Sequence, residues 1–105
     1  MELGLTGKIS IVTGGSKGIG RTTALALAQE GSDVAICARG VEELEAAAAE
    51  IRDQTGRKVL AIRADMSNLD DIKKMVSTTV AELGGVDILI NNAVNSVAAP
   101  FMELK

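Results

Sequence analysis

Short apolar runs alternate along this chain with longer segments in which apolar and polar residues are mixed. The apolar runs are nearly continuous rather than alternating with polar residues, which is typical of strands covered on both faces. In the longer segments, apolar residues recur every three or four positions, as they do on one face of a helix. The pattern predicts strands at 8–13, 33–38, 58–62 and 86–90, separated by helices at 18–30, 41–55 and 68–83.

Local signals define the ends of these helices. Gly31, Gly56 and Gly84 follow the three helical segments, and glycine at that position commonly ends a helix. Ser67 is placed as the N-cap of the third helix, with Asp70 as its capping-box partner three residues later. We expect this helix to bury one apolar stripe, formed by Leu69, Ile72, Val76, Val80 and Leu83.

The regular alternation of strands and helices predicts an α/β fold. Successive strands joined by helices are parallel, and their crossovers are right-handed. We therefore expect a doubly wound parallel sheet with strand order 3-2-1-4, helices on both faces, and a switch point between strands 1 and 4. The chain has 105 residues, enough for one small domain, and contains no linker or low-complexity tract.

Composition argues against several functional classes. The net charge is −3 and no basic stripe is present, which argues against a nucleic-acid partner. No apolar run approaches the length of a membrane span, and the first residues do not resemble a secretory signal. Cys37 is the only cysteine, so no internal disulfide can form and a reducing, cytoplasmic location is expected. The lack of His, together with the single Cys, excludes a His-based or Cys-cluster metal site.

The most informative stretch is the sequence Thr-Gly-Gly-Ser-Lys-Gly-Ile-Gly at 13–20, directly after the first strand. A strand that enters a tight turn and then a helix points backbone N–H groups and the positive helix end at one spot, where a phosphate fits. Gly14 can adopt the dihedrals that the turn needs, Gly18 leaves room for a pyrophosphate, and Gly20 lets the helix pack closely. The alternative is an ordinary glycine loop.

Three motifs, in this order and spacing, resemble the short-chain dehydrogenase/reductase family. Residues 13–20 resemble the family's TGxxxGxG turn, and Asp65 with Met66 resembles its adenine-contacting Asp after the third strand. Residues 91–94, Asn-Asn-Ala-Val, resemble its NNAG motif, although Val94 stands where the family usually has Gly. The resemblance covers essentially the whole chain and is greatest to the 3-oxoacyl carrier-protein reductase type.

The resemblance implies a Rossmann-like fold, in which residues 1–105 are the N-terminal, NAD(P)-binding part of a single domain truncated after its fourth strand. It also implies hydride transfer to or from a small-molecule carbonyl or alcohol, in a full-length protein that forms a homo-oligomer. In the family, catalysis depends on a Ser and a Tyr-x-x-x-Lys pair further along, and this chain has no Tyr, so we assign no catalytic residue and expect the chain alone to be inactive. The alternative is a non-catalytic dinucleotide-binding fragment. The residues that the resemblance and the glycine turn assign to the cofactor are Gly14, Ser16, Lys17, Gly18, Ile19, Gly20, Arg39, Asp65, Met66, Asn92 and Ala93.

The residues after the second strand indicate which dinucleotide is preferred. An NAD site usually has an acid about 20 residues after the glycine motif, which accepts a hydrogen bond from the ribose 2′-OH. The sequence there is Ala38-Arg39-Gly40, without an acid. Arg39 and Lys17 could instead grip a 2′-phosphate, so we predict NADP rather than NAD. Two alternatives remain: both cations are solvated surface charges, and Asp65 caps the following helix instead of contacting adenine.

Overall fold

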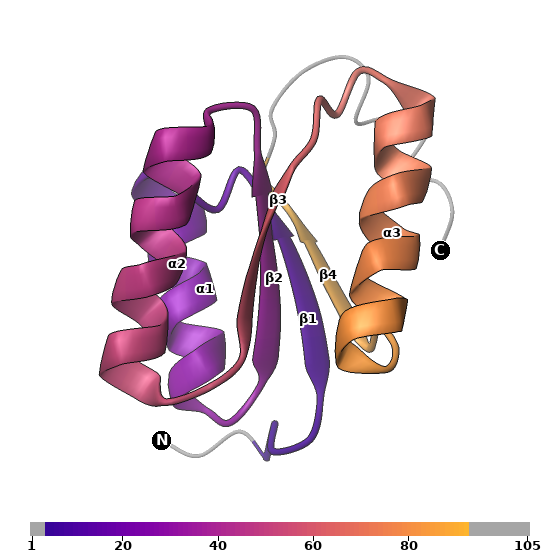
Figure 1. Cartoon of the computed structure of the whole chain (residues 1–105). Coiled ribbons are helices and arrows are strands. Elements are labelled where there is room, and N and C mark those ends of the chain that lie inside the picture. The colour runs from indigo at the N-terminus through magenta and orange to yellow at the C-terminus, as the bar shows by residue number, and fades with distance from the viewer. Residues whose placement is uncertain (1–3, 93–105) are drawn as a thin grey trace.

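The computed structural model describes residues 4–92 and confirms the predicted alternation of strands and helices (Figure 1). Element boundaries agree with the sequence pattern to within one or two residues. The described elements are β1 (Ile9–Thr13), α1 (Gly18–Gln29), β2 (Asp33–Ala38), α2 (Val41–Thr55), β3 (Val59–Arg63), α3 (Leu69–Leu83) and β4 (Ile88–Asn91).

The four strands form one parallel sheet in the order β3-β2-β1-β4, as predicted. Val12 of β1 is in register with Ile36 of β2 on one side and with Ile90 of β4 on the other. The chain passes from β3 at one edge to β4 at the opposite edge, and α3 makes this connection on the face opposite to α1 and α2 (Figure 1). The switch point therefore lies between β1 and β4.

The sheet separates two apolar cores. On one face, Val12 and Ile36 pack with Leu44 and Ile51 of α2 and with the small residues of α1, and all four of these side chains are buried. On the other face, the core around Met75 of α3 contains Ile11, Ala35, Cys37 and Ala64. Burial raises the pKa of the Cys37 thiol to about 12, so this side chain behaves as a small apolar residue.

The expectation of strands covered on both faces is correct for the two central strands and wrong for the edges. All residues of β1 after Ile9 are buried, and so are the four central residues of β2. In contrast, β4 is only half-buried, and 40% of Leu89 is exposed. In the described part of the chain, α3 alone covers the face of the sheet opposite to α1 and α2, and it does not reach over both edges (Figure 1).

The predicted buried stripe of α3 is wrong in part. Met75 and Thr79 are the residues of this helix that are fully buried, with Ile72 and Leu83 packed beside them. Leu69, Val76 and Val80 lie on the flank of the helix, and Leu69 is 64% exposed. Compared with the predicted stripe, the face of α3 that packs on the sheet is therefore shifted toward Thr79. The Thr79 hydroxyl donates to the Met75 carbonyl at 2.8 Å, so it can be buried at little cost.

The predicted N-cap of α3 is also wrong. Asn68, not Ser67, caps the helix, and its Oδ1 accepts a hydrogen bond from the Asp71 N–H at 3.1 Å. The Ser67 hydroxyl is engaged by Asp65, whose carboxylate accepts from it at 2.6 Å. The helix therefore begins one residue later than a Ser67 cap would require.

Candidate functional site

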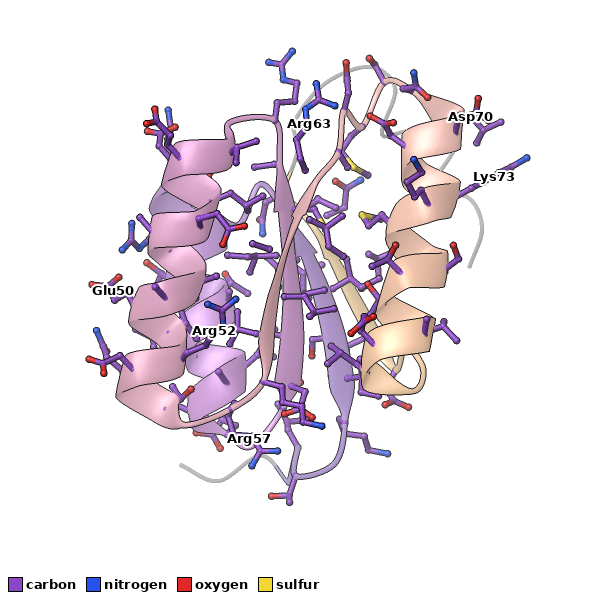
Figure 2. The ribbon with its side chains drawn as sticks, viewed as in Figure 1. Glu50, Arg52, Arg57, Arg63, Asp70 and Lys73 are labelled. Atoms are coloured by element: carbon purple, nitrogen blue, oxygen red, sulfur yellow. The ribbon has the colours of Figure 1, made fainter. Side chains whose placement is uncertain are left out.

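The predicted site residues that the structure describes gather at the carboxyl edge of the sheet. Because the strands are parallel, the turn after β1, the end of β2, the loop after β3 and the end of β4 all meet at this edge, at the top of Figure 1. Figure 2 shows Arg63, at the end of β3, reaching out at the same edge, while Arg57, just before β3, lies at the opposite edge. Ala93 lies outside the described residues.

The glycine turn between β1 and α1 is held tightly against its neighbours. The N–H groups of Gly14 and Gly15 both donate to the Cys37 carbonyl, at 2.7 and 3.3 Å, which ties the turn to the end of β2. A Cβ on Gly20 would lie 1.9 Å from the Gly14 carbonyl oxygen, so α1 approaches the turn more closely than any side chain allows. Ser16 is buried within the same turn.

The N-terminus of α1 keeps its first-turn N–H groups available. Lys17 is the N-cap residue, and among the described residues no side chain caps the helix and no acid stands in its first turn. The N–H groups of Gly18, Ile19 and Gly20 have no partner within the helix. In contrast, α3 has both the Asn68 cap and acids in its first turn. An anion at the α1 terminus would satisfy these donors.

Open space lies in front of this helix terminus. Gly18 has a φ of +54°, and a Cβ placed on it would meet no atom within 4 Å. Ile19 is 78% exposed beside it. The backbone at this point is therefore accessible to a ligand that approaches closely.

The end of β4 is joined to the end of β1 through one buried hydroxyl. Thr13 Oγ1 donates to Asn91 Oδ1 at 2.8 Å and accepts from the Asn92 N–H at 3.0 Å. Asn92 also packs against the glycine turn, because a Cβ on Gly14 would lie 3.4 Å from the Asn92 backbone. Asn92 Nδ2 is buried, and no residue in the range 4–92 accepts a hydrogen bond from it. A buried donor of this kind normally has a hydrogen-bond acceptor, which a ligand or a water molecule can supply.

Lys17 extends from the turn toward the N-terminus of α2. Its Nζ lies 3.3 Å from Glu43 Oε1, in the first turn of that helix. Arg39 is exposed at the end of β2, one residue before Gly40, which is the N-cap of α2. Lys17 and Arg39 are thus both adjacent to the start of α2.

Asp65 forms a local turn that leads into α3. Its carboxylate accepts from the Ser67 hydroxyl at 2.6 Å and from the Ser67 N–H at 2.9 Å. These hydrogen bonds lower the pKa of the Asp65 carboxyl, and the positive charges of Arg39 and Arg63 act in the same direction. Asp65 is thus a fixed anion at the carboxyl edge, while Met66 is half-buried against the core below.

The sequence pattern missed two residues of this region. Thr13 is part of the glycine motif, and its position at the end of a buried strand was the available signal for its linking role. Glu43 gave no such signal, because an acid in the first turn of a helix is explained by the helix dipole alone. Within residues 4–92, no group of three or more Cys, Asp or Glu side chains could hold a metal ion, and no helix is both long and apolar enough to span a membrane.

Comparisons with known proteins agree with this geometry. The family model described as short chain dehydrogenase matches residues 8–105. The short chain dehydrogenase/reductase astE of Aspergillus oryzae is 38% identical over 104 residues, which cover 98% of this chain and 40% of that protein. The 3-oxoacyl-[acyl-carrier-protein] reductase FabG of Staphylococcus epidermidis is 41% identical over 86 residues, covering 82% of this chain and 35% of that protein.

A solved structure is similar to this chain as well. L-Sorbose reductase from Gluconobacter frateurii, complexed with NADPH and L-sorbose, superimposes with a TM-score of 0.86 and 35% identity. The superposition covers 90% of this chain and 36% of that one. This chain therefore spans well under half the length of the relatives that it matches.

Proposed function

This chain belongs to the short chain dehydrogenase family, and from that premise we propose that it forms the cofactor-binding part of an NADP-dependent oxidoreductase. In this proposal, residues 1–105 are the N-terminal part of one Rossmann-fold domain. The whole protein would interconvert an oxo group and a hydroxyl on a small molecule, as a homo-oligomer. Bound NADP would supply or accept the hydride.

The observation that carries the proposal is the N-terminus of α1. The Gly14 and Gly15 N–H groups are used by the Cys37 carbonyl, whereas those of Gly18, Ile19 and Gly20 have neither a helical partner nor a side-chain cap. These donors, together with the positive helix end, suit the pyrophosphate of a dinucleotide. The open space before Gly18 would admit that group, and Ser16 would lie in the same turn.

The rest of the cofactor would extend along the carboxyl edge. Asp65, which is kept charged by its hydrogen bonds, would accept from the adenine amino group beside Met66. Asn92 and Ala93 would line the ribose on the nicotinamide side, and the buried Asn92 Nδ2 would gain an acceptor there. The residues present therefore fit a dinucleotide.

The preference for NADP rests on Lys17 and Arg39. Both are next to the start of α2, and no acid stands among residues 38–40, where a 2′-hydroxyl would need one. A guanidinium can form a bidentate pair with a phosphate, and a nearby ammonium adds a second positive charge. The Lys17 side chain is 71% exposed in its pair with Glu43, so the binding experiment decides between this role and the alternative that Lys17 is only a solvated charge.

Binding to the 105-residue chain tests the proposal directly. Binding of added NADPH or NADH can be followed through the fluorescence of the reduced nicotinamide. We expect NADPH to bind more tightly than NADH, and Arg39→Ala to weaken NADPH by about 10- to 100-fold while NADH changes little. Lys8→Ala is the matched control, because it removes a positive charge at the amino end of β1. Equal affinities for the two nucleotides would refute the NADP preference.

The competing proposal is a dinucleotide-binding fragment without chemistry of its own. The lack of Tyr favours it for the 105 residues taken alone. Both proposals require the same binding result, and both expect no carbonyl reduction by the 105 residues alone. They are separated by the coding sequence: a reading frame that continues past Lys105 into a Ser and a Tyr-x-x-x-Lys pair supports the oxidoreductase, and one that stops at Lys105 supports the fragment proposal.

A further inference from the structure

An ion pair joins the glycine turn to the first turn of α2. Lys17 Nζ and Glu43 Oε1 are 3.3 Å apart, with side chains 71% and 57% exposed. A Cβ on Gly40 would lie 3.4 Å from the same Glu43 oxygen, so this carboxylate leans back over the N-terminus of α2. Arg39 immediately precedes Gly40. The Glu43 carboxylate thus pairs with one of the two cations assigned above to the 2′-phosphate and lies near the residue that follows the other.

We propose that Glu43 sets how strongly the protein discriminates between NADP and NAD, an inference that rests on the proposed function. A 2′-phosphate carries nearly two negative charges, so it must share Lys17 with Glu43 or displace it. A ribose 2′-hydroxyl carries no charge and can donate a hydrogen bond to the carboxylate. Glu43 therefore weakens binding of the phosphorylated nucleotide selectively and moderates the effect of Lys17 and Arg39.

The neighbouring acid makes the assignment specific. Glu42 and Glu43 both stand in the first turn of α2, and both favour the helix dipole. Glu43 pairs with Lys17, whereas Glu42 forms no ion pair within residues 4–92. A general effect of negative charge on the helix would appear in variants of both residues, but an effect through Lys17 would appear only at position 43.

Glutamine is the informative replacement. Glu43 occupies the third position of α2, where either Glu or Gln can reach back toward the N-cap backbone. Glu43→Gln therefore removes the charge and keeps the local acceptor. Glu42→Gln removes the same charge one residue earlier and is the matched control.

The test uses 2′,5′-ADP and 5′-AMP as probes, measured by isothermal titration calorimetry on the 105-residue chain. We expect Glu43→Gln to bind 2′,5′-ADP about three- to tenfold more tightly and 5′-AMP no more tightly than the original chain. Glu42→Gln should change neither affinity by more than about twofold. The gain in Glu43→Gln should shrink as salt rises, because the two side chains are exposed.

A double-mutant cycle separates this role from a structural one. In a Lys17→Ala background, Glu43→Gln should lose most of its effect on 2′,5′-ADP. Thermal melts of both glutamine variants check that each remains folded.

The outcomes distinguish the inference from the proposed function. A chain that prefers 2′,5′-ADP, but in which the two glutamine variants behave alike, overturns the role of Glu43 and leaves the NADP proposal standing. A chain that does not prefer 2′,5′-ADP overturns the NADP proposal, and this inference with it. A loss of both affinities in Glu43→Gln alone would show a structural role and would also overturn the inference.

Discussion

Replacing Gly20 with Ala should destabilise this chain more than the same replacement at Gly18 or Gly56. Gly20 belongs to α1 and does not have a positive φ, so its backbone conformation suits any residue. On an open helix surface the added methyl would therefore stabilise by about 1 kcal/mol. The close packing around Gly20 reverses this effect, so that the added methyl destabilises the chain.

The magnitude follows from the packing of α1 on the turn. The new Cβ would lie 1.9 Å from the Gly14 carbonyl oxygen and 2.7 Å from its carbon, whereas ordinary contact begins at 3.4 Å. Both atoms belong to the backbone, so the turn or the helix must move by about 1.5 Å. Such overpacking costs about 1–3 kcal/mol, and strain on the two bonds to the Cys37 carbonyl adds about 1 kcal/mol. After subtraction of the propensity gain, we expect a loss of about 1–3 kcal/mol in the free energy of unfolding.

Urea denaturation followed by far-ultraviolet circular dichroism measures this loss, since the chain has no Trp for fluorescence. Gly56→Ala is the matched control. Gly56 has a φ of +71° at the end of α2, and its Cβ would meet nothing within 4 Å, so only the backbone strain of about 1 kcal/mol remains.

The variant Gly18→Ala separates an effect on stability from an effect on NADPH binding. Gly18 also has a positive φ and open space around it, so its cost in stability should match that of Gly56→Ala. Its methyl would point into the space assigned to the pyrophosphate, so NADPH binding should fall by at least about tenfold in Gly18→Ala and remain unchanged in Gly56→Ala. If Gly20→Ala proves no less stable than Gly56→Ala, the close packing of α1 on the turn is not what makes glycine necessary there.

Three further predictions follow from the same structure. Thr13→Val should lower the free energy of unfolding in urea by about 1–2 kcal/mol and weaken NADPH binding, because it removes the hydroxyl that joins β1 to β4. Thr13→Ser should keep most of the stability and most of the NADPH affinity, and a fully stable Val variant would contradict the linking role. Cys37 should be alkylated by iodoacetamide at pH 8 far more slowly in the folded chain than in urea, because burial raises its pKa to about 12; equally rapid labelling would refute its burial. The Asp65 pKa, measured by NMR, should lie below its ordinary value of 3.8 and rise in Ser67→Ala. Because the folded pKa is the lower one, the stability that Asp65 contributes is present at neutral pH and lost as the pH falls through that pKa; an unchanged pKa in the variant would count against the hydrogen bonds as its cause.

The order of the elements and the order of the strands could both be read from the sequence. Apolar runs and helical periodicity are local properties, so they predict strands and helices without knowledge of the fold. The handedness of the crossovers then restricts the sheet to few arrangements. The glycine turn at 13–20 could be placed at a carboxyl strand end for the same reason, because a strand comes before it and a helix after it.

The face that α3 buries could not be read in this way. Two overlapping stripes satisfy helical spacing, one through Leu69, Val76 and Val80 and one through Met75 and Thr79. The first is more apolar, but the second packs against the sheet, where Met75 and Thr79 are fully buried. Tertiary packing therefore overrode local hydrophobicity, and the Thr79 hydroxyl is satisfied by its own helix.

The sequence by itself determined which residues reach the carboxyl edge, because the direction of parallel strands follows from their order in the chain. Only the tertiary structure decided how those residues meet. The contact of Gly14 with Asn92 and the pairing of Lys17 with Glu43 join segments that come together only through the strand register and the helix packing. Distances of this kind depend on how whole elements pack, and no local pattern in the sequence encodes them.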